Sequence, residues 1–176
     1  MKGISIKENL WMIVLTILCI ACFPINPLVL TGLLKPGYYL PLFVLGWISW
    51  AIGKVLVMAP IIMFPRRGGV SKGKTFVHTT QVVNTGIYSV IRHPQYTGGI
   101  LSIFIATPLL FPHWVLVVLG IPGAIILYWS TFEEDKRLIE QFGNDYQDYI
   151  NRVPRANILL GIYRVIINKS SEKQKK

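Results

Sequence analysis

The sequence predicts an all-α, multi-pass membrane helical bundle, because it is rich in apolar residues, poor in charge and divided into long uncharged runs. Of its 176 residues, 52% are apolar and 15% are charged, and the mean hydropathy is +0.50. A soluble domain of this length carries about a quarter charged residues. The apolar content excludes a disordered chain, and two cysteines are too few for a disulfide-rich secreted scaffold.

Four apolar runs predict about four membrane spans. Spanning the hydrocarbon of a bilayer takes about 20 residues, so the third run is short. Pro24 and Pro27 interrupt the first run, and its helix is expected to end near Phe23. Only Pro112 and His113 separate the last two runs, which predicts a tight helical hairpin. The four runs are Leu10–Leu34, Tyr38–Phe64, Gly98–Phe111 and Trp114–Phe132.

The distribution of basic residues predicts the orientation. The net charge is +10, from 18 Lys and Arg against 8 Asp and Glu. Four crossings place both termini and the 66–95 loop on one side with most of the cations, leaving Lys35 and His113 opposite. The positive-inside rule makes the cation-rich side cytoplasmic. Because the cations flank apolar runs instead of forming one exposed basic face, nucleic-acid binding is excluded.

Polar residues inside the first two spans have simple structural interpretations. We expect Lys54 to face the bundle interior with a backbone partner, with snorkelling or a cavity-facing position as alternatives. Cys19 and Cys22 form a C-x-x-C pair without further metal ligands, so we interpret them as reduced core thiols and predict no metal site. One structural domain is expected, with membrane helices over 1–65 and a catalytic region over 66–176.

Two polar segments flank the predicted hairpin, and chemistry is expected there. In the first, Thr79–Tyr96, Gly86 favours a turn and Pro94 suits the first turn of a helix. In the second, the fourth helix is expected to leave the membrane after Phe132, continue to Phe142 and stop at Gly143. A short amphipathic helix then starts at Asn144 or Asp145 and ends before Pro154.

The second segment opens with three consecutive acids, Glu133, Glu134 and Asp135, directly after the apolar run. A simple ion pair between Glu133 and Arg137, worth about 0.2–0.5 kcal/mol, is one explanation for them. A functional site is the other.

The two segments together resemble the signature of the isoprenylcysteine carboxyl methyltransferase and phospholipid methyltransferase superfamily of membrane enzymes. The first matching string is Gly86-x-Tyr88-x-x-x-Arg92-His93-Pro94-x-Tyr96. The second is Glu133-Glu134-x-x-x-Leu138-x-x-x-Phe142-Gly143-x-x-Tyr146-x-x-Tyr149-x-x-x-Val153-Pro154. The resemblance covers residues 80 to 154. It implies methyl transfer from S-adenosylmethionine, bound as co-substrate in a cytosol-facing pocket formed by the 80–96 loop and the 133–154 segment.

The resemblance also implies a set of cofactor-binding residues. Glu134 matches the acid that holds the amino group of S-adenosylmethionine, and Arg92 or helix N–H groups suit its carboxylate. Interfacial anchoring is the alternative role for Arg92, Tyr88 and Tyr96. The expected cofactor residues are Gln81, Val82, Val83, Tyr88, Arg92, His93, Pro94, Gln95, Tyr96 and Glu134.

The methyl acceptor is expected to be lipid-like, and the resemblance puts an isoprenylcysteine carboxylate first. Ser130 stands where that branch has an arginine thought to meet the carboxylate, which leaves Arg137, Arg152 or Arg155 as substitutes. An amino-phospholipid is the main alternative and would require a base, for which His93 and Glu133 are candidates. A small-molecule thiol is a further alternative acceptor.

Outside this enzyme class, a nicotinamide-dependent membrane reductase and a non-catalytic membrane scaffold stay open. The expected partners are the lipid bilayer and a lipid-like or prenylated acceptor. Oligomeric state, including a homo-oligomer, is not determined by the sequence. His113 lies on the opposite side in the predicted topology, and His78 fits no position of either string.

Overall fold

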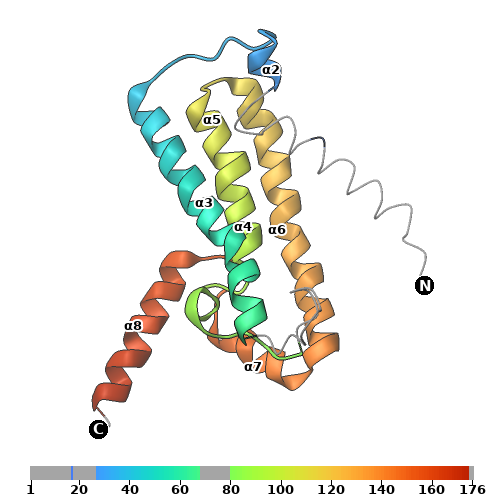
Figure 1. The fold of residues 1–176 in the computed structure, drawn as a ribbon, viewed down its shortest axis with the longest axis vertical. Helices are drawn as coiled ribbons and strands as arrows, with labels where there is room; N and C mark the ends of the chain where they lie inside the picture. The colour runs from blue at the N-terminus through green and yellow to red at the C-terminus, as the bar shows by residue number, and fades with distance from the viewer. Residues whose placement is uncertain (1–16, 18–26, 68–79, 175–176) are drawn as a thin grey trace, which may run out of the picture. The chain divides into compact units, whose positions relative to one another are not determined.

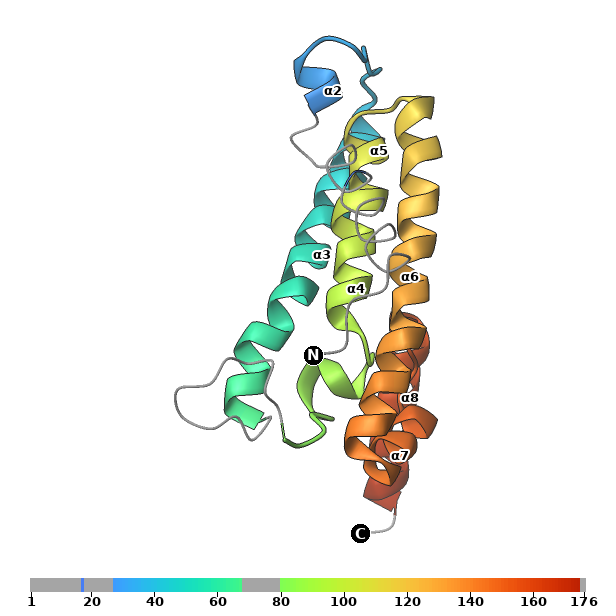
Figure 2. The same cartoon turned by 90° about the vertical axis from the view of Figure 1, so that its right-hand side faces the viewer.

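The computed structural model describes residues 17, 27–67 and 80–174, and the described residues are helical with no strand among them. Figures 1 and 2 show the helices in two views. Cys19, Cys22, His78 and most of the Leu10–Leu34 run lie outside the described residues. The elements are α2 (Pro27–Leu30), α3 (Leu40–Arg67), the 3-10 helix η1 (Gly86–Ser89), α4 (Pro94–Gly99), the π-helix η2 (Ile100–Ile105), α5 (Ala106–Leu110), α6 (Trp114–Phe142), α7 (Asn144–Arg152) and α8 (Ile158–Gln174).

Two of the described helices are long and apolar enough to cross a membrane: Leu40–Phe64 within α3, and α6. Both carry many exposed large apolar side chains, as lipid contact requires. The predicted hairpin is confirmed, because helical structure runs from α4 through α5 and resumes at Trp114 after a short turn. A count of about four spans and the cytoplasmic orientation stay predictions.

The chain divides into two compact units, one of residues 1–55 and 98–130 and the other of residues 56–97 and 131–176. In the first unit, small residues allow close helix packing. The Ser49 hydroxyl donates to the Leu101 carbonyl at 2.9 Å, and Phe104 and Ile126 form a buried apolar cluster. Interfaces of this kind are typical of membrane helices. The predicted boundary between residues 65 and 66 stays a prediction.

Lys54 belongs to the first unit and is half-buried. Its ammonium lies 5.6 Å from the centre of the Trp50 ring, within the range of a cation–π interaction. An aromatic ring is therefore one partner of this cation, and the backbone partner expected from the sequence stays a prediction.

In the second unit, the turns and helix ends from Gly86 to Pro154 follow the sequence prediction closely, whereas α8 was not predicted. Gly86 takes a φ of +63° at the start of η1, and Gly143 a φ of +59° between α6 and α7, a region that side chains with a Cβ rarely adopt. Helix α6 ends at Phe142 and α7 ends at Arg152, two residues before Pro154, as predicted. Tyr146, Tyr149 and Val153 form the core that attaches α7 to its unit.

A backbone pairing links the two polar segments within this unit. The N–H of Arg92 donates to the Pro154 carbonyl at 3.0 Å, and the N–H of His93 donates to the Arg155 carbonyl at 3.1 Å. The segment before α4 is therefore held directly against the segment that follows α7.

Candidate active site

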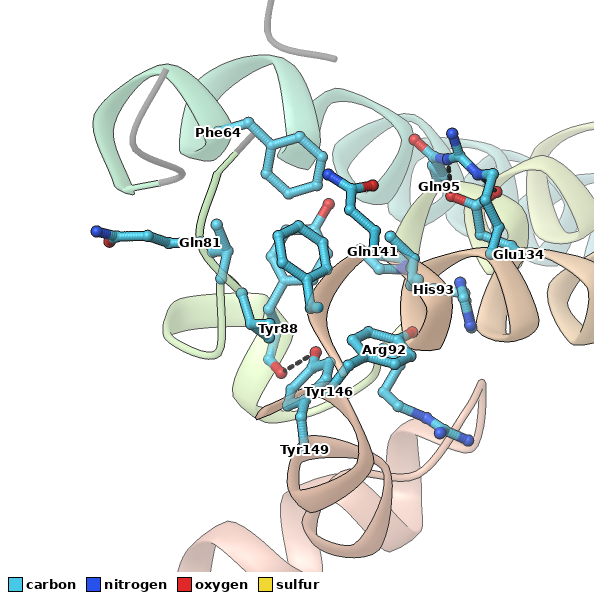
Figure 3. A pocket seen from close by; sticks show the side chains of 16 residues that line it. Phe64, Gln81, Tyr88, Arg92, His93, Gln95, Glu134, Gln141, Tyr146 and Tyr149 are labelled. Atoms are coloured by element: carbon cyan, nitrogen blue, oxygen red, sulfur yellow. Dashed lines mark hydrogen bonds and ion pairs between the residues drawn. The ribbon is translucent and has the colours of Figure 1, made fainter. Parts of the chain in front are cut away.

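One cavity of the second unit brings the two polar segments together (Figure 3). It holds about 830 Å³ of empty space, counting its open mouth. Nine of the ten residues expected to bind a cofactor line it: Gln81, Val82, Val83, Tyr88, Arg92, His93, Pro94, Gln95 and Glu134. Seven further residues complete the lining: Phe64, Arg137, Leu138, Gln141, Phe142, Tyr146 and Tyr149.

Asp135 does not line the cavity, but it binds side chains that do. It is 4% exposed, and its Oδ1 accepts hydrogen bonds from His93 Nε2 at 2.8 Å and from the Tyr146 hydroxyl at 2.7 Å. Its Oδ2 accepts from Arg155 Nε at 3.1 Å and Nη2 at 2.8 Å, and Arg92 Nη1 lies 3.6 Å away. One buried carboxylate therefore connects α6, α7, the segment before α4 and the segment after α7.

These contacts determine how His93 is oriented. Because a carboxylate only accepts hydrogen bonds, the Nε2 atom of His93 must carry a hydrogen and donate it in the bond to Asp135 Oδ1. The imidazole is 4% exposed and its ring meets the Tyr96 ring edge to face, with centres 5.7 Å apart. His93 is thus held in one orientation and one tautomer at the cavity wall.

Tyrosines build the aromatic part of the cavity. The Tyr149 hydroxyl donates to the Tyr88 carbonyl at 2.7 Å, and the Tyr88 ring stacks on Phe64 with centres 5.2 Å apart. Figure 3 shows Phe64 and Tyr88 at one end of the cavity, with Gln95 and Glu134 at the other. Burial is the main cause that raises the pKa of Tyr88, Tyr146 and Tyr149, so all three stay protonated at neutral pH.

Glu134 and Arg137 form an ion pair on the cavity wall. Arg137 Nε donates to Glu134 Oε2 at 3.1 Å, and Nη2 donates to the other carboxylate oxygen. The Glu134 side chain is 20% exposed and that of Arg137 is 60% exposed. Such a surface pair contributes about 0–1 kcal/mol, so a ligand can exchange partners with it at low cost.

Arg92 is the least satisfied polar side chain of the cavity. Its side chain is 7% exposed, and its Nε and Nη1 atoms have no hydrogen-bond partner among the described residues. A buried guanidinium with unused donors is suited to an anionic ligand group.

The remaining expected site residues lie outside the cavity lining. Tyr96 contacts the His93 ring, and burial followed by the charge of Glu134 raises the pKa of its phenol. Glu133 is exposed and pairs with Lys136 at 2.9 Å, not with Arg137. Arg152 donates to the Asp148 carbonyl at 3.2 Å, beside a neighbouring polar groove, and Arg155 is bound to Asp135.

Asp135 is the residue that sequence reasoning missed. It is the third of the three consecutive acids, and the resembling strings gave weight to the other two. Helical spacing could have identified Asp135 as buried. It lies one turn before Leu138 and Ile139, which pack against the tyrosines of α7, so it faces the same side of α6. Tyr146 and Tyr149 were recognised as part of a motif, but not as cavity residues.

Comparisons with known proteins place the chain among methyltransferases. The family model of phospholipid methyltransferases matches residues 42–145. Methanethiol S-methyltransferase 2 of Bradyrhizobium diazoefficiens is 43% identical over 68 residues, which cover 39% of this chain and 25% of that protein. Methanethiol S-methyltransferase of Pseudomonas deceptionensis is 26% identical over 114 residues, covering 62% of this chain and 42% of that protein.

The matched segments therefore span less than half the length of either relative. No solved structure matches the chain.

Proposed function

The chain belongs to the phospholipid methyltransferase family, and from that premise we propose that it transfers a methyl group from S-adenosylmethionine, bound in the cavity of Figure 3, to a membrane-soluble acceptor. One observation carries the proposal. Nine residues that the family resemblance implies as cofactor contacts come from two segments far apart in sequence, and they line a single cavity.

The chemistry of the cavity fits this ligand. Small-molecule sites combine apolar walls with a few polar groups. S-adenosylmethionine carries an ammonium, a sulfonium, a carboxylate and a flat adenine. Glu134 offers a carboxylate for the ammonium, Arg92 offers unused donors for the carboxylate, and the Phe64 and Tyr88 rings offer stacking surface.

In the proposed reaction, the residues of this chain act mainly by binding the co-substrate and orienting it. The co-substrate supplies an already activated methyl group when it is bound. Glu134 and Arg92 would hold its two charged ends, and Asp135 would keep His93 and Tyr146 in place at the wall. The apolar lining from Val82, Val83 and other residues would limit water around the bound co-substrate, which would strengthen these charge interactions.

For the acceptor we put a small apolar thiol first. The names of both relatives specify methanethiol as their acceptor. Arg92, Arg137 and Glu134 line the cavity, and Asp135 and Arg155 lie behind its wall. Together these residues carry three positive charges and two negative charges. This excess of positive charge favours a thiolate over a cationic amine. The thiol proton would leave to water or to His93, the one imidazole in the lining.

The prenylcysteine carboxylate ranks lower because of what Ser130, at the position of the family's arginine, and the three candidate substitutes for that arginine do. The Ser130 hydroxyl donates to the Ile126 carbonyl of its own helix at 2.9 Å. Arg155 is engaged by Asp135, and Arg152 lies outside the cavity. Arg137 alone reaches the lining, where it pairs with Glu134. An amino-phospholipid ranks second, because the family model describes phospholipid methyltransferases.

The binding step is tested by calorimetric titration of S-adenosylmethionine and, separately, NADPH into detergent-purified protein. Wild type should bind the first and not the second, and Glu134→Ala should weaken binding at least tenfold. Glu140→Ala is the matched control, because Glu140 is an exposed acid of the same helix outside the cavity. Binding of NADPH alone would support a reductase, and binding of neither by folded protein would support a scaffold.

The acceptor is tested by methyl transfer from isotopically labelled S-adenosylmethionine in lipid nanodiscs. A short alkyl thiol, phosphatidylethanolamine and a prenylcysteine are supplied in separate reactions. A labelled thioether is expected. Labelled phospholipid or methyl ester, with no thioether, would reassign the acceptor and leave the binding result intact.

A further inference from the structure

Helix α8 carries a broad apolar face that points away from its unit. Between residues 159 and 167, seven residues are exposed, and six of them are large and apolar. Leu159 is 81% exposed and Tyr163 is 62% exposed. The seventh exposed residue is Arg164. The six apolar residues, Leu159, Leu160, Ile162, Tyr163, Ile166 and Ile167, are named here the outer face of α8.

The opposite side of α8 is fixed to the second unit. A Cβ at Gly161 would overlap the carbonyl oxygen of Val90, so the glycine permits direct contact between the helix and that backbone. Arg164 Nη1 also donates to the Arg152 carbonyl at 3.3 Å, and at the start of α8 the Asn157 Oδ1 atom caps the helix by accepting from the Leu160 N–H at 3.0 Å. The exposure of the outer face is therefore a consequence of how α8 is anchored.

The length of the apolar stretch determines whether it can span a membrane or only bind at its surface. Ile158–Ile167 is a mostly apolar stretch of ten residues with one charge, Arg164, and is about 15 Å long at 1.5 Å per residue. The hydrocarbon core is about 30 Å thick, so this stretch cannot span it. A helix of this kind lies in the plane of the bilayer, with its apolar side between the headgroups and the acyl chains.

The charge of the sequence from α8 to residue 176 favours one class of lipid. From Ile158 to Lys176 the sequence holds five cations, at Arg164, Lys169, Lys173, Lys175 and Lys176, against one acid, Glu172. Cations near an anionic membrane surface are attracted to it. Apolar residues come first and most cations follow, so the 158–176 segment combines an apolar stretch with a basic end, as anionic lipid favours.

We infer that α8 is an interfacial membrane helix whose outer face inserts into the headgroup region of an anionic lipid leaflet. The contact of Gly161 with Val90 then ties the membrane surface to the segment that leads into Arg92 and His93. The inference concerns lipid contact alone and does not depend on the proposed reaction.

The test places nitroxide labels on the full-length chain in lipid vesicles. In a background of Cys19→Ser and Cys22→Ser, single cysteines replace Leu159, Ile166 or, as the matched control, exposed Glu140 of α6. Collision rates with oxygen, which partitions into lipid, and with a water-soluble nickel chelate are measured. The oxygen-to-nickel ratio should be several-fold higher at positions 159 and 166 than at 140.

Lipid charge gives the second arm of the test. The ratio at position 159 should fall several-fold when vesicles rich in phosphatidylglycerol are replaced by pure phosphatidylcholine, and an unchanged ratio would overturn the anionic preference. Higher nickel than oxygen collision at 159 and 166 would place the outer face in water. Low collision with both reagents, together with spin–spin broadening, would assign the face to a second copy. Either result would overturn the inference.

Discussion

Asp135 Oδ1 and His93 Nε2 lie 2.8 Å apart, although 42 residues separate them in the sequence. The bond crosses from α6 to the segment before α4, and both side chains are nearly fully buried. Asp135 also accepts hydrogen bonds from Tyr146 and Arg155 and pairs with Arg92, so His93 is oriented by a group that three further partners hold. Such over-determined positioning is what a binding or catalytic site requires of its supporting residues.

Replacing Asp135 with Asn should destabilise the protein severely. The substitution keeps the shape of the side chain but removes its charge, leaving Arg92 and Arg155 without their counter-ion. Loss of one partner from a buried ion pair costs about 3–5 kcal/mol. We expect a marked fall in the melting temperature, measured by circular dichroism in detergent. We also expect a loss of S-adenosylmethionine binding.

Glu140→Gln is the control for Asp135→Asn, because it removes one negative charge from an exposed position of the same helix. It should leave the melting temperature close to that of wild type. A wild-type melting temperature for Asp135→Asn would show that the hydrogen bonds of Asp135 do not support the unit.

Replacing Tyr149 with Phe isolates a single hydrogen bond. The ring stays in the core of α7, but the Tyr88 carbonyl loses the donor that lies 2.7 Å away. An unsatisfied buried acceptor costs about 1–3 kcal/mol. Because Tyr88 lines the cavity, S-adenosylmethionine affinity should fall several-fold in calorimetry. Tyr163→Phe, on the exposed side of α8, should change neither stability nor affinity.

The stability of the second unit should decrease above pH 10. The phenols of Tyr88, Tyr146 and Tyr149 have pKa values raised above 10 in the folded state, chiefly by burial, whereas in the unfolded chain they titrate near 10.0. Below pH 10 both states are protonated, so the stabilisation is complete. As the pH rises above 10, the unfolded state loses protons first and unfolding is favoured.

Tyrosinate absorbance and circular dichroism, recorded together, test this pH dependence. The folded protein should show less tyrosinate than the denatured protein until the helical signal is lost. If all eight tyrosines ionised near pH 10 with the helical signal intact, these three phenols would not be buried as the structure has them.

The ends of α6 and α7 were predictable because local chemistry determines them, whereas α8 was not predicted from the sequence. Gly143 marked the end of α6, and Pro154 followed the end of α7, since few other residues suit those backbone positions. The cavity lining was predictable for a different reason. The spacing of two strings, compared with a known family, identified residues that meet only in three dimensions.

Long-range pairing limited what the sequence alone could predict. Three adjacent acids look alike in a sequence, and nothing local shows that Asp135 is buried while Glu133 is exposed. The partners of Asp135 include Arg155, which sequence reasoning offered as a substrate contact and the structure assigns to this carboxylate. Tertiary contacts, not residue type, decide which acid lines the cavity and which supports its wall.

Replacing Gly161 with Ala should separate α8 from the rest of its unit. A Cβ there overlaps the Val90 carbonyl oxygen, a backbone atom that cannot rotate away. Overpacking of this kind costs about 1–3 kcal/mol, and the strain falls on the segment that leads to Arg92. We expect a lower melting temperature and weaker S-adenosylmethionine binding. Gly37→Ala is the matched control, because its Cβ would meet its nearest neighbour at an ordinary 3.8 Å. If the Gly161 variant matched the Gly37 variant in both measurements, the contact between α8 and Val90 would not support the cavity.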